Sequence, residues 1–277
     1  VHLHAHTYHS LLDGLTKIDA LTKSVKENGM EAVAITDHGT MSGTIEFYTQ
    51  AKKDGIKPIL GMETYVAART RFDRDPNHDK PRYHLTLLAK NEAGWKNLSM
   101  LSTKANLEGM YYKPRIDHDL MKECSEGIIC LSGCAGSEIS DALKNDDYEK
   151  ALGHAKWYKS VYNDDFYLEL QDHGHPDCPN HWDVQEKINK GLFKINKELG
   201  IPLVVTCDSH YLTHENQDAH EILLCVGTGS YLSDEKRMSL KEFDLFVTDP
   251  RDIIKRWGKI DPQIILNTKE VADKVNF

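Results

Sequence analysis

The sequence opens with Val1-His2-Leu3-His4-Ala5-His6-Thr7-Tyr8-His9-Ser10, closed by Asp13-Gly14. Side chains of a β-strand alternate between its two faces, so this spacing places His2, His4 and His6 on one face, with Leu3 and Ala5 on the other. Neutral imidazoles that converge from one strand are good ligands for a transition metal. The stretch therefore predicts that the chain is a scaffold for a metal cluster.

Composition narrows the class of protein. The chain has 277 residues, 40% of them hydrophobic and 28% charged, which fits one large α/β domain or two small ones. It has no apolar run long enough for a membrane span or a secretory signal, and its six cysteines form no CxxC pair. We therefore expect a cytoplasmic protein with reduced thiols. The net charge of −9 argues against a protein that coats DNA, but not against a metal-dependent nuclease, because bound cations offset it locally.

Short β-rich apolar runs alternate with segments of helical periodicity, which is typical of βα units in a parallel sheet or barrel. Strands are predicted at residues 1–6, 32–36, 58–66, 83–89, 127–132, 165–170 and 202–207. Helices are predicted at 19–28, 42–53, 92–105, 148–162 and 180–199, with a short one after Gly136. Residues 69–82 and 109–119 are predicted to be loops. Residues 215–277 are predicted to be mostly helical, with a short β-turn piece near 243–248.

Residues of the kinds that bind metals recur at or near the ends of these strands. In a parallel α/β barrel those ends meet at one mouth, where active sites are built. The candidates are His4, His6, Asp13, His38, Glu63, His84, Cys134, Asp208 and His210. So many ligands imply two or three ions that share bridging carboxylates. Clustered ions activate a shared water and clamp the oxygens of a phosphoryl centre, so the expected chemistry is phosphoester hydrolysis.

Each motif also has a simpler interpretation. The alternating histidines could be a solvated strand face, Asp37-His38-Gly39 a turn, Glu63 or His84 an ordinary half-buried polar residue, and Cys134 a small buried hydrophobe. Their joint placement at strand ends favours the metal.

Three other groups of residues stand apart from this cluster. His173, His175, Cys178 and His181 could hold a single structural zinc as a rival site, although that spacing matches no common zinc module. His9 and His118 are expected at the surface. The segment Tyr111-Tyr112-Lys113-Pro114-Arg115 could stack a base and hold a phosphate, or could be a loop anchored by its own tyrosines.

Together the motifs resemble the polymerase and histidinol phosphatase (PHP) domain, more narrowly that at the amino terminus of bacterial DNA polymerase III alpha subunits. The matching stretches are His4-x-His6 with Ser10 and Asp13-Gly14, Ile35-Thr36-Asp37-His38-Gly39, Gly61-Met62-Glu63, Tyr83-His84-Leu85, Leu131-Ser132-Gly133-Cys134 and Asp208-Ser209-His210-Tyr211. The resemblance implies a distorted (β/α)7 TIM-like barrel, with two or three divalent ions (zinc or manganese, also magnesium or iron) at its mouth. The implied ligands are the nine residues named above, none of which is missing.

The implied activity is a 3′→5′ proofreading exonuclease in which a metal-bound water, not a side chain, is the nucleophile. Lys113 and Arg115 would hold the nucleic-acid backbone. Residues 1–277 would be a single domain excised from a larger DNA-directed DNA polymerase, with 215–277 leading to the polymerase core. Its partners would be a DNA 3′ end, that core and replisome subunits. Two alternatives remain open: a phosphatase of a small phosphoester, and a structural, metal-stabilised module that supports the polymerase.

Overall fold

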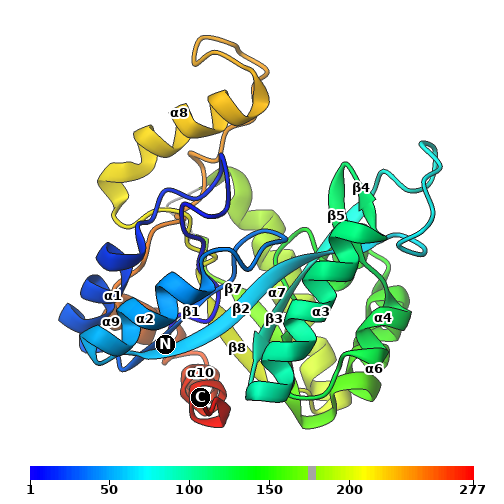
Figure 1. Ribbon diagram of the computed structural model, residues 1–277, viewed down its shortest axis with the longest axis horizontal. Coiled ribbons are helices and arrows are strands. Elements are labelled where there is room, and N and C mark those ends of the chain that lie inside the picture. The colour runs from blue at the N-terminus through cyan, green and yellow to red at the C-terminus, as the bar shows by residue number, and fades with distance from the viewer. Residues whose placement is uncertain (174–178) are drawn as a thin grey trace.

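A curled sheet wrapped by helices forms the body of the protein (Figure 1). The structure is a computed structural model that describes residues 1–173 and 179–277, without the side chains of 179–182. Its main strands are β1 (Ala32–Ile35), β2 (Lys57–Ala67), β3 (Arg82–Ala89), β6 (Ile128–Leu131), β7 (Phe166–Gln171) and β8 (Leu203–Thr206). They hydrogen-bond in the order β1-β2-β3-β6-β7-β8. All six overlap strands predicted from the sequence.

Residues 1–6 close this sheet into a ring. On one side, Ala34 N donates to His2 O (2.9 Å) and Thr36 N donates to Ala5 O (2.8 Å). On the other side, His6 N donates to Ser209 O (2.7 Å), just after β8. The amino-terminal segment thus takes the place of the seventh strand, through isolated bridges instead of a regular ladder. The predicted α/β class and distorted barrel are confirmed.

The direction of β3 differs from a uniformly parallel barrel. It runs antiparallel to both neighbours, β2 and β6, whereas β1–β2, β6–β7 and β7–β8 are parallel. The connection accounts for this: residues 68–81 join β2 to β3 without a helix, whereas the crossover between parallel strands usually contains one. The start of β3, not its end, therefore lies at the mouth.

The predicted loop 109–119 is instead structured. It contains β4 (Met110–Tyr111) and β5 (Lys113–Ile116), which pair antiparallel around Tyr112, and it leads into α4 (His118–Glu123). β5 also pairs parallel with β2 at Tyr65 and Val66, beyond the part of β2 that meets β1. The loop prediction was wrong because this pairing depends on a distant strand.

Helices cover the outside of the ring and one end of it. They are α1 (Ile18–Glu27), α2 (Thr44–Asp54), α3 (Glu92–Leu107), α5 (Glu138–Lys144), α6 (Tyr148–Tyr162), α7 (Pro179–Leu199), α9 (Pro250–Trp257) and α10 (Pro262–Lys274). Val271, Ala272 and Val275 at the end of the chain pack among the apolar residues inside the ring, which include Leu3, Ile59 and Val204. Helix α8 (Gln217–Thr228) instead stands out from the body with the loop after it (Figure 1).

Two short 3₁₀ turns, η1 (Asn163–Asp165) and η2 (His214–Asn216), precede β7 and α8. Near the predicted β-turn piece at 243–248, Phe246 forms an isolated bridge with Tyr211. Among the described residues, no helix combines the length and the apolar character needed to cross a membrane.

Candidate metal centre

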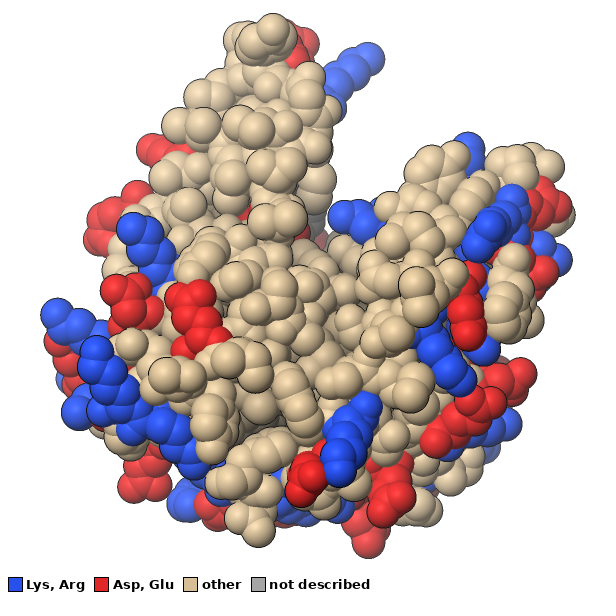
Figure 2. Space-filling model, viewed as in Figure 1, with Lys and Arg blue, Asp and Glu red and all other residues tan. Residues whose placement is uncertain are grey.

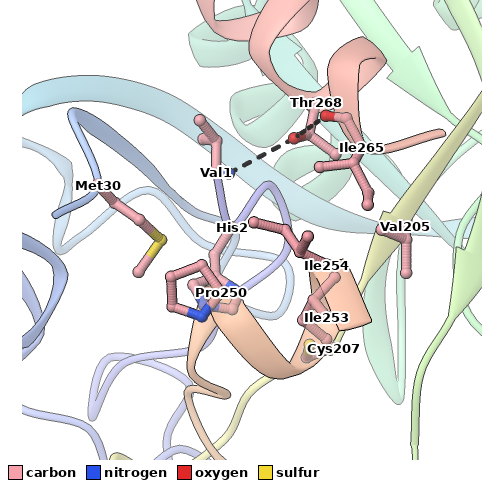
Figure 3. A pocket seen from close by; sticks show the side chains of 10 residues that line it. All are labelled: Val1, His2, Met30, Val205, Cys207, Pro250, Ile253, Ile254, Ile265 and Thr268. Carbon is pink, nitrogen blue, oxygen red and sulfur yellow. Dashed lines mark hydrogen bonds between the residues drawn. The ribbon is translucent and has the colours of Figure 1, made fainter. Parts of the chain in front are cut away.

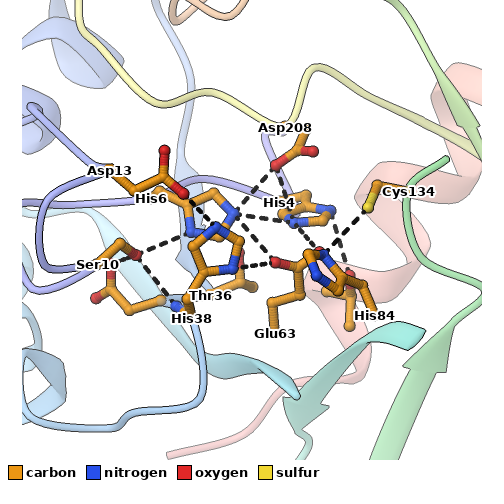
Figure 4. Close-up of polar contacts among 12 residues, drawn as sticks. His4, His6, Ser10, Asp13, Thr36, His38, Glu63, His84, Cys134 and Asp208 are labelled. Carbon is orange, nitrogen blue, oxygen red and sulfur yellow. Dashed lines mark hydrogen bonds and ion pairs between the residues drawn. The ribbon is translucent and has the colours of Figure 1, made fainter. Parts of the chain in front are cut away.

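The nine candidate ligands lie together at one mouth of the ring. Figure 4 labels all of them except His210. Four overlapping groups have ligand atoms within 4.8 Å of one another: His6, His38 and His210; His4, His6 and Asp208; His38, Glu63 and His84; and Glu63, Cys134 and Asp208. Asp13 joins them through its Oδ2, 2.8 Å from His38 Nε2. Residues separated by about two hundred positions in the chain thus share one site.

The strands explain this convergence. Glu63 lies within β2 and faces the inside of the ring, and His84 lies at the start of the reversed strand β3. Asp208 and His210 follow β8, and His38 follows β1. The groups that follow a strand emerge at the same mouth as the start of β3, so topology brings them together.

His2 does not belong to the cluster, and the predicted alternation fails there. Leu3 packs inside the ring although His4 also points inward, so the chain bends at His4 and the period of two is lost. His2 instead lines an apolar cavity of ≈ 80 Å³ with Met30, Pro250 and others (Figure 3). Its Nε2 lies 2.9 Å from Thr248 O, and burial lowers its pKa to about 4.

Burial and close charges set the protonation of the cluster. Burial opposes a charge on His4, but the carboxylates of Asp208, Glu169 and Glu63 outweigh it and raise the pKa of His4 to about 10. Burial, with His38 and His210 nearby, lowers the pKa of His6 to about 3. Burial raises the pKa of the Cys134 thiol, and the neighbouring carboxylates raise it further. Without a cation, the His4 imidazole and the Cys134 thiol therefore retain protons that a divalent ion would displace, while nearby histidines, despite burial, hold the pKa of Glu63 and Asp208 well below its usual range.

The donor atoms fit a divalent cation better than they fit one another. His4 Nε2 and His6 Nε2 are 3.2 Å apart, and His38 Nδ1 is 2.5 Å from Glu63 Oε2. Among the described residues, the buried atoms without a hydrogen-bond partner include Asp13 Oδ1, His38 Nδ1, Glu63 Oε2 and Asp208 Oδ1. Buried polar atoms normally have partners, and buried charges coordinate metals or are paired. Lone pairs gathered in this way match the imidazole and carboxylate ligands of zinc or manganese.

Outer residues hold these side chains in place. Glu169, fully buried in β7, lies 2.6 Å from His4 Nδ1 through Oε1 and accepts a hydrogen bond from Gly133 N through Oε2 (3.1 Å). Ser10 Oγ lies 2.9 Å from His6 Nδ1 and donates to Asp37 Oδ1 (2.8 Å). Asp37 thus supports the centre from outside it. Sequence reasoning gave no role to Glu169; the signal was its place near the end of a predicted strand.

Comparison with known proteins identifies the family of this chain. Residues 2–173 match the PHP domain family. The chain belongs to that family. It is 41% identical over 275 residues to DNA polymerase III subunit alpha of Borreliella burgdorferi, covering 99% of this chain and 23% of that protein. The same subunit of Treponema pallidum is 40% identical over 278 residues, covering 100% of this chain and 23% of that protein. The chain thus spans about a quarter of the length of these relatives.

Among solved structures, one match is an amidohydrolase from Chromobacterium violaceum with a TM-score of 0.41 and 12% identity. It covers 76% of this chain and 87% of that chain. At this level the likeness says nothing about activity.

The two substrate-side residues predicted for this PHP domain have different surroundings. Arg115 is 1% exposed, and its guanidinium donates to the carbonyl oxygens of Gly109, Asp79, Arg71 and Asp73. It has no free face for a phosphate, so its predicted role is corrected to a structural one. Lys113 is exposed, with Nζ 5.6 Å from the centre of the Tyr65 ring, and Tyr65 contacts His38 and His84.

The remaining histidines named from the sequence have ordinary partners where they are described. His9 Nδ1 lies 3.0 Å from Ser42 Oγ. His118 stacks on Trp157 (centroids 3.9 Å apart), and its Nε2 lies 2.9 Å from Glu138. Of the rival zinc site, only His173 is described; it is buried, with Nε2 2.5 Å from Gln171 Oε1. His175, Cys178 and His181 lie outside the described side chains.

Proposed function

We propose that this PHP domain is a metal-dependent phosphodiesterase that removes nucleotides from the 3′ end of DNA, as the proofreading exonuclease of a replicative polymerase. The observation that carries the proposal is the convergence of nine ligand-type side chains, four of which (Asp13, His38, Glu63 and Asp208) have a buried atom without a hydrogen-bond partner among the described residues. We assign the metal ligands as His4, His6, Asp13, His38, Glu63, His84, Cys134, Asp208 and His210. When bound, divalent ions would supply an activated water and offset the charge that develops on the phosphoryl oxygens.

The burial of these side chains suggests how a substrate approaches. The His4 and His6 side chains are 0% exposed, whereas those of His38, His84 and Asp13 are 14%, 26% and 28% exposed. The second group forms the open rim of the centre. A strand end would therefore meet His38, His84 and Asp13 first, while Glu169 holds His4 from below.

Two cations beside the rim suit a nucleic-acid strand. Lys113 Nζ and Arg82 Cζ lie 5.6 and 5.8 Å from the centre of the Tyr65 ring, and among the described residues neither forms an ion pair with an acid. Figure 2 shows Lys and Arg atoms on the β4–β5 side of the hollow that separates this side from the α8 side. We assign Lys113 and Arg82 to the phosphate of a neighbouring nucleotide, which a monoester substrate would lack.

The setting of the reaction follows from the relatives. Because the chain spans about a quarter of their length, we propose that polymerization belongs to the rest of a longer parent protein in the bacterial cytoplasm. That polymerase core and other replisome subunits would be the protein partners.

The test is digestion of a 3′-labelled primer, matched or mismatched at its end, with Mn²⁺, Zn²⁺, Mg²⁺ or Fe²⁺ added to metal-stripped protein. We expect nucleotides to be released from the 3′ end by the protein and by a His214→Ala control, whose changed side chain is exposed. A His4→Ala, Asp208→Ala double variant should release none. Equal rates for the protein and the double variant would refute the proposal. Release of phosphate from a monoester with no action on DNA would favour a phosphatase instead, and a metal-dependent rise in Tm without any cleavage would favour a structural module.

A further inference from the structure

One buried histidine at the mouth has no place among the nine assigned ligands. His220 lies on α8 and is 1% exposed, and its Nε2 has no hydrogen-bond partner among the described residues. It faces Asp13 Oδ1, itself an unpartnered buried atom, at 3.7 Å. The other oxygen of Asp13, Oδ2, points to His38 Nε2 at 2.8 Å, the side of the cluster. One carboxylate thus lies between the centre and α8.

The same face of α8 packs along the loop that carries Asp13. Leu224, one turn after His220, is 4% exposed, and Gly227, two turns after it, approaches the loop so closely that a Cβ there would lie 3.0 Å from Leu12 O. Residues spaced by four and seven lie on one face of a helix. The opposite face is exposed, with Ile222 at 52% and Val226 at 64%. α8 is therefore held to the body along a single face that includes His220.

The loop after α8 is hydrogen-bonded to the helix through Glu221, the residue that follows His220. Glu221 is fully buried and accepts hydrogen bonds from Leu240 N (2.7 Å), Ser239 Oγ (2.7 Å) and Arg237 Nη1 (2.5 Å). Residues 217–240 thus form one unit, which we call the arm. It forms the side of the hollow opposite β4 and β5 (Figure 2).

We propose that His220 is a positioning residue of the metal centre: its Nε2 fixes Asp13 for metal binding, and metal binding in turn fixes the arm. The inference rests on the proposed metal centre. An imidazole that donates to Oδ1 leaves Oδ2 free to bind a cation, and such outer partners set the orientation of a ligand. Because coupling between two events is reciprocal, a residue that strengthens metal binding is itself held more firmly when metal is bound. Metal binding at the centre therefore fixes the position of the arm, which forms one wall of the hollow where the substrate would bind.

The experiment compares metal affinity in the protein and three variants, measured by Mn²⁺ titration calorimetry of the metal-stripped chains. His220→Leu keeps a buried side chain but removes the donor, and should weaken binding at one site about 10- to 100-fold. His220→Gln keeps a donor and should restore most of the affinity. His214→Leu, on the exposed turn before α8, is the matched control and should bind as the unchanged protein does. Melting of each variant in EDTA shows whether it is folded.

A second measurement does not depend on the folding of any variant. Hydrogen exchange of the α8 amides should slow when Mn²⁺ is added to the unchanged protein. Equal affinity of His220→Leu and the unchanged protein, equally weak binding by Leu and Gln variants, or α8 exchange that ignores metal would each overturn the proposal. Metal binding without DNA cleavage would count against the proposed exonuclease activity alone. No metal binding at all would overturn both the exonuclease proposal and the role proposed for His220.

Discussion

Replacing Arg115 with alanine separates the structural role found for it from the DNA contact predicted from sequence. Its guanidinium donates to four main-chain carbonyls: Gly109 O at 3.1 Å, Asp79 O and Arg71 O at 3.2 Å, and Asp73 O at 2.8 Å. The first three bonds are buried and the fourth is partly buried, so water can replace the donor only at Asp73. Gly109 O also accepts from the main-chain N–H of Arg115 (3.3 Å), which alanine keeps, so two buried acceptors, Asp79 O and Arg71 O, lose their donor. Each such loss costs about 1–1.5 kcal/mol at the lower end of the usual range, so Arg115→Ala should cost about 2–3 kcal/mol. That is a large share of a typical stability of about 5–15 kcal/mol.

The assay is urea unfolding followed by circular dichroism, with Lys113→Ala as the control. Lys113 is exposed two residues away on the same strand, so its truncation should change the free energy of unfolding by less than about 0.5 kcal/mol. It should, however, weaken DNA cleavage. An Arg115→Ala protein whose free energy of unfolding lies within about 1 kcal/mol of the unchanged protein would refute the structural reading.

Three further changes probe the centre and its support. Glu169→Gln keeps the shape but removes the charge opposite His4 Nδ1 (2.6 Å), so metal affinity should fall about 10- to 100-fold in the same calorimetric titration. Gly14→Ala would place a Cβ 2.0 Å from Thr7 O, so the loop that carries Asp13 must shift. The variant should therefore retain less metal when measured by mass spectrometry. Metal retention equal to that of the unchanged protein would show that the loop accommodates the added methyl group without moving Asp13. Burial opposes the charge of His4, but Asp208, Glu169 and Glu63 raise its pKa to about 10 in the metal-free protein. A raised pKa stabilises the fold fully below pH ~6.5, and this stabilisation is lost as pH rises to about 10, so the metal-free protein should lose stability over that window. A metal ion must displace the same His4 proton, so metal affinity should rise between pH ~6.5 and about 10, and binding should release protons in weakly buffered solution. Metal affinity that does not change with pH would contradict the charge assigned to His4.

What could be predicted from sequence was what depends on nearby residues. Apolar runs and helical periodicity located the ring strands, and α6 was predicted with the bounds that the structure shows, Tyr148–Tyr162. These features depend on local pattern, so distant contacts do not overrule them. One failure involves a distant partner: β5 forms because β2 extends past β1. The other was an inference from typical βα order: β3 reverses because the connection before it contains no helix, as the loop predicted at 69–82 already indicated.

Residues 1–6 show both a correct prediction from local pattern and a failure caused by distant contacts. Its histidine spacing correctly placed His4 and His6 together, but not His2, because Leu3 is drawn into the ring among Ala34, Ile59 and Val204. Apolar burial at one end of the segment thus overrides the alternation that a regular strand would keep.

The supporting residues of the centre were the hardest to find, for a physical reason. A ligand can be recognised by its type and by its place at a strand end, but Glu169 and His220 matter only through the residues they face. Glu169 reaches His4 across 165 positions, and His220 reaches Asp13 from a helix that follows the last strand of the ring. Their pairing exists only once the ring has closed through residues 1–6. The closure that places His4 opposite Glu169 is also what makes the centre, so neither partner can be assigned a role before the fold is known.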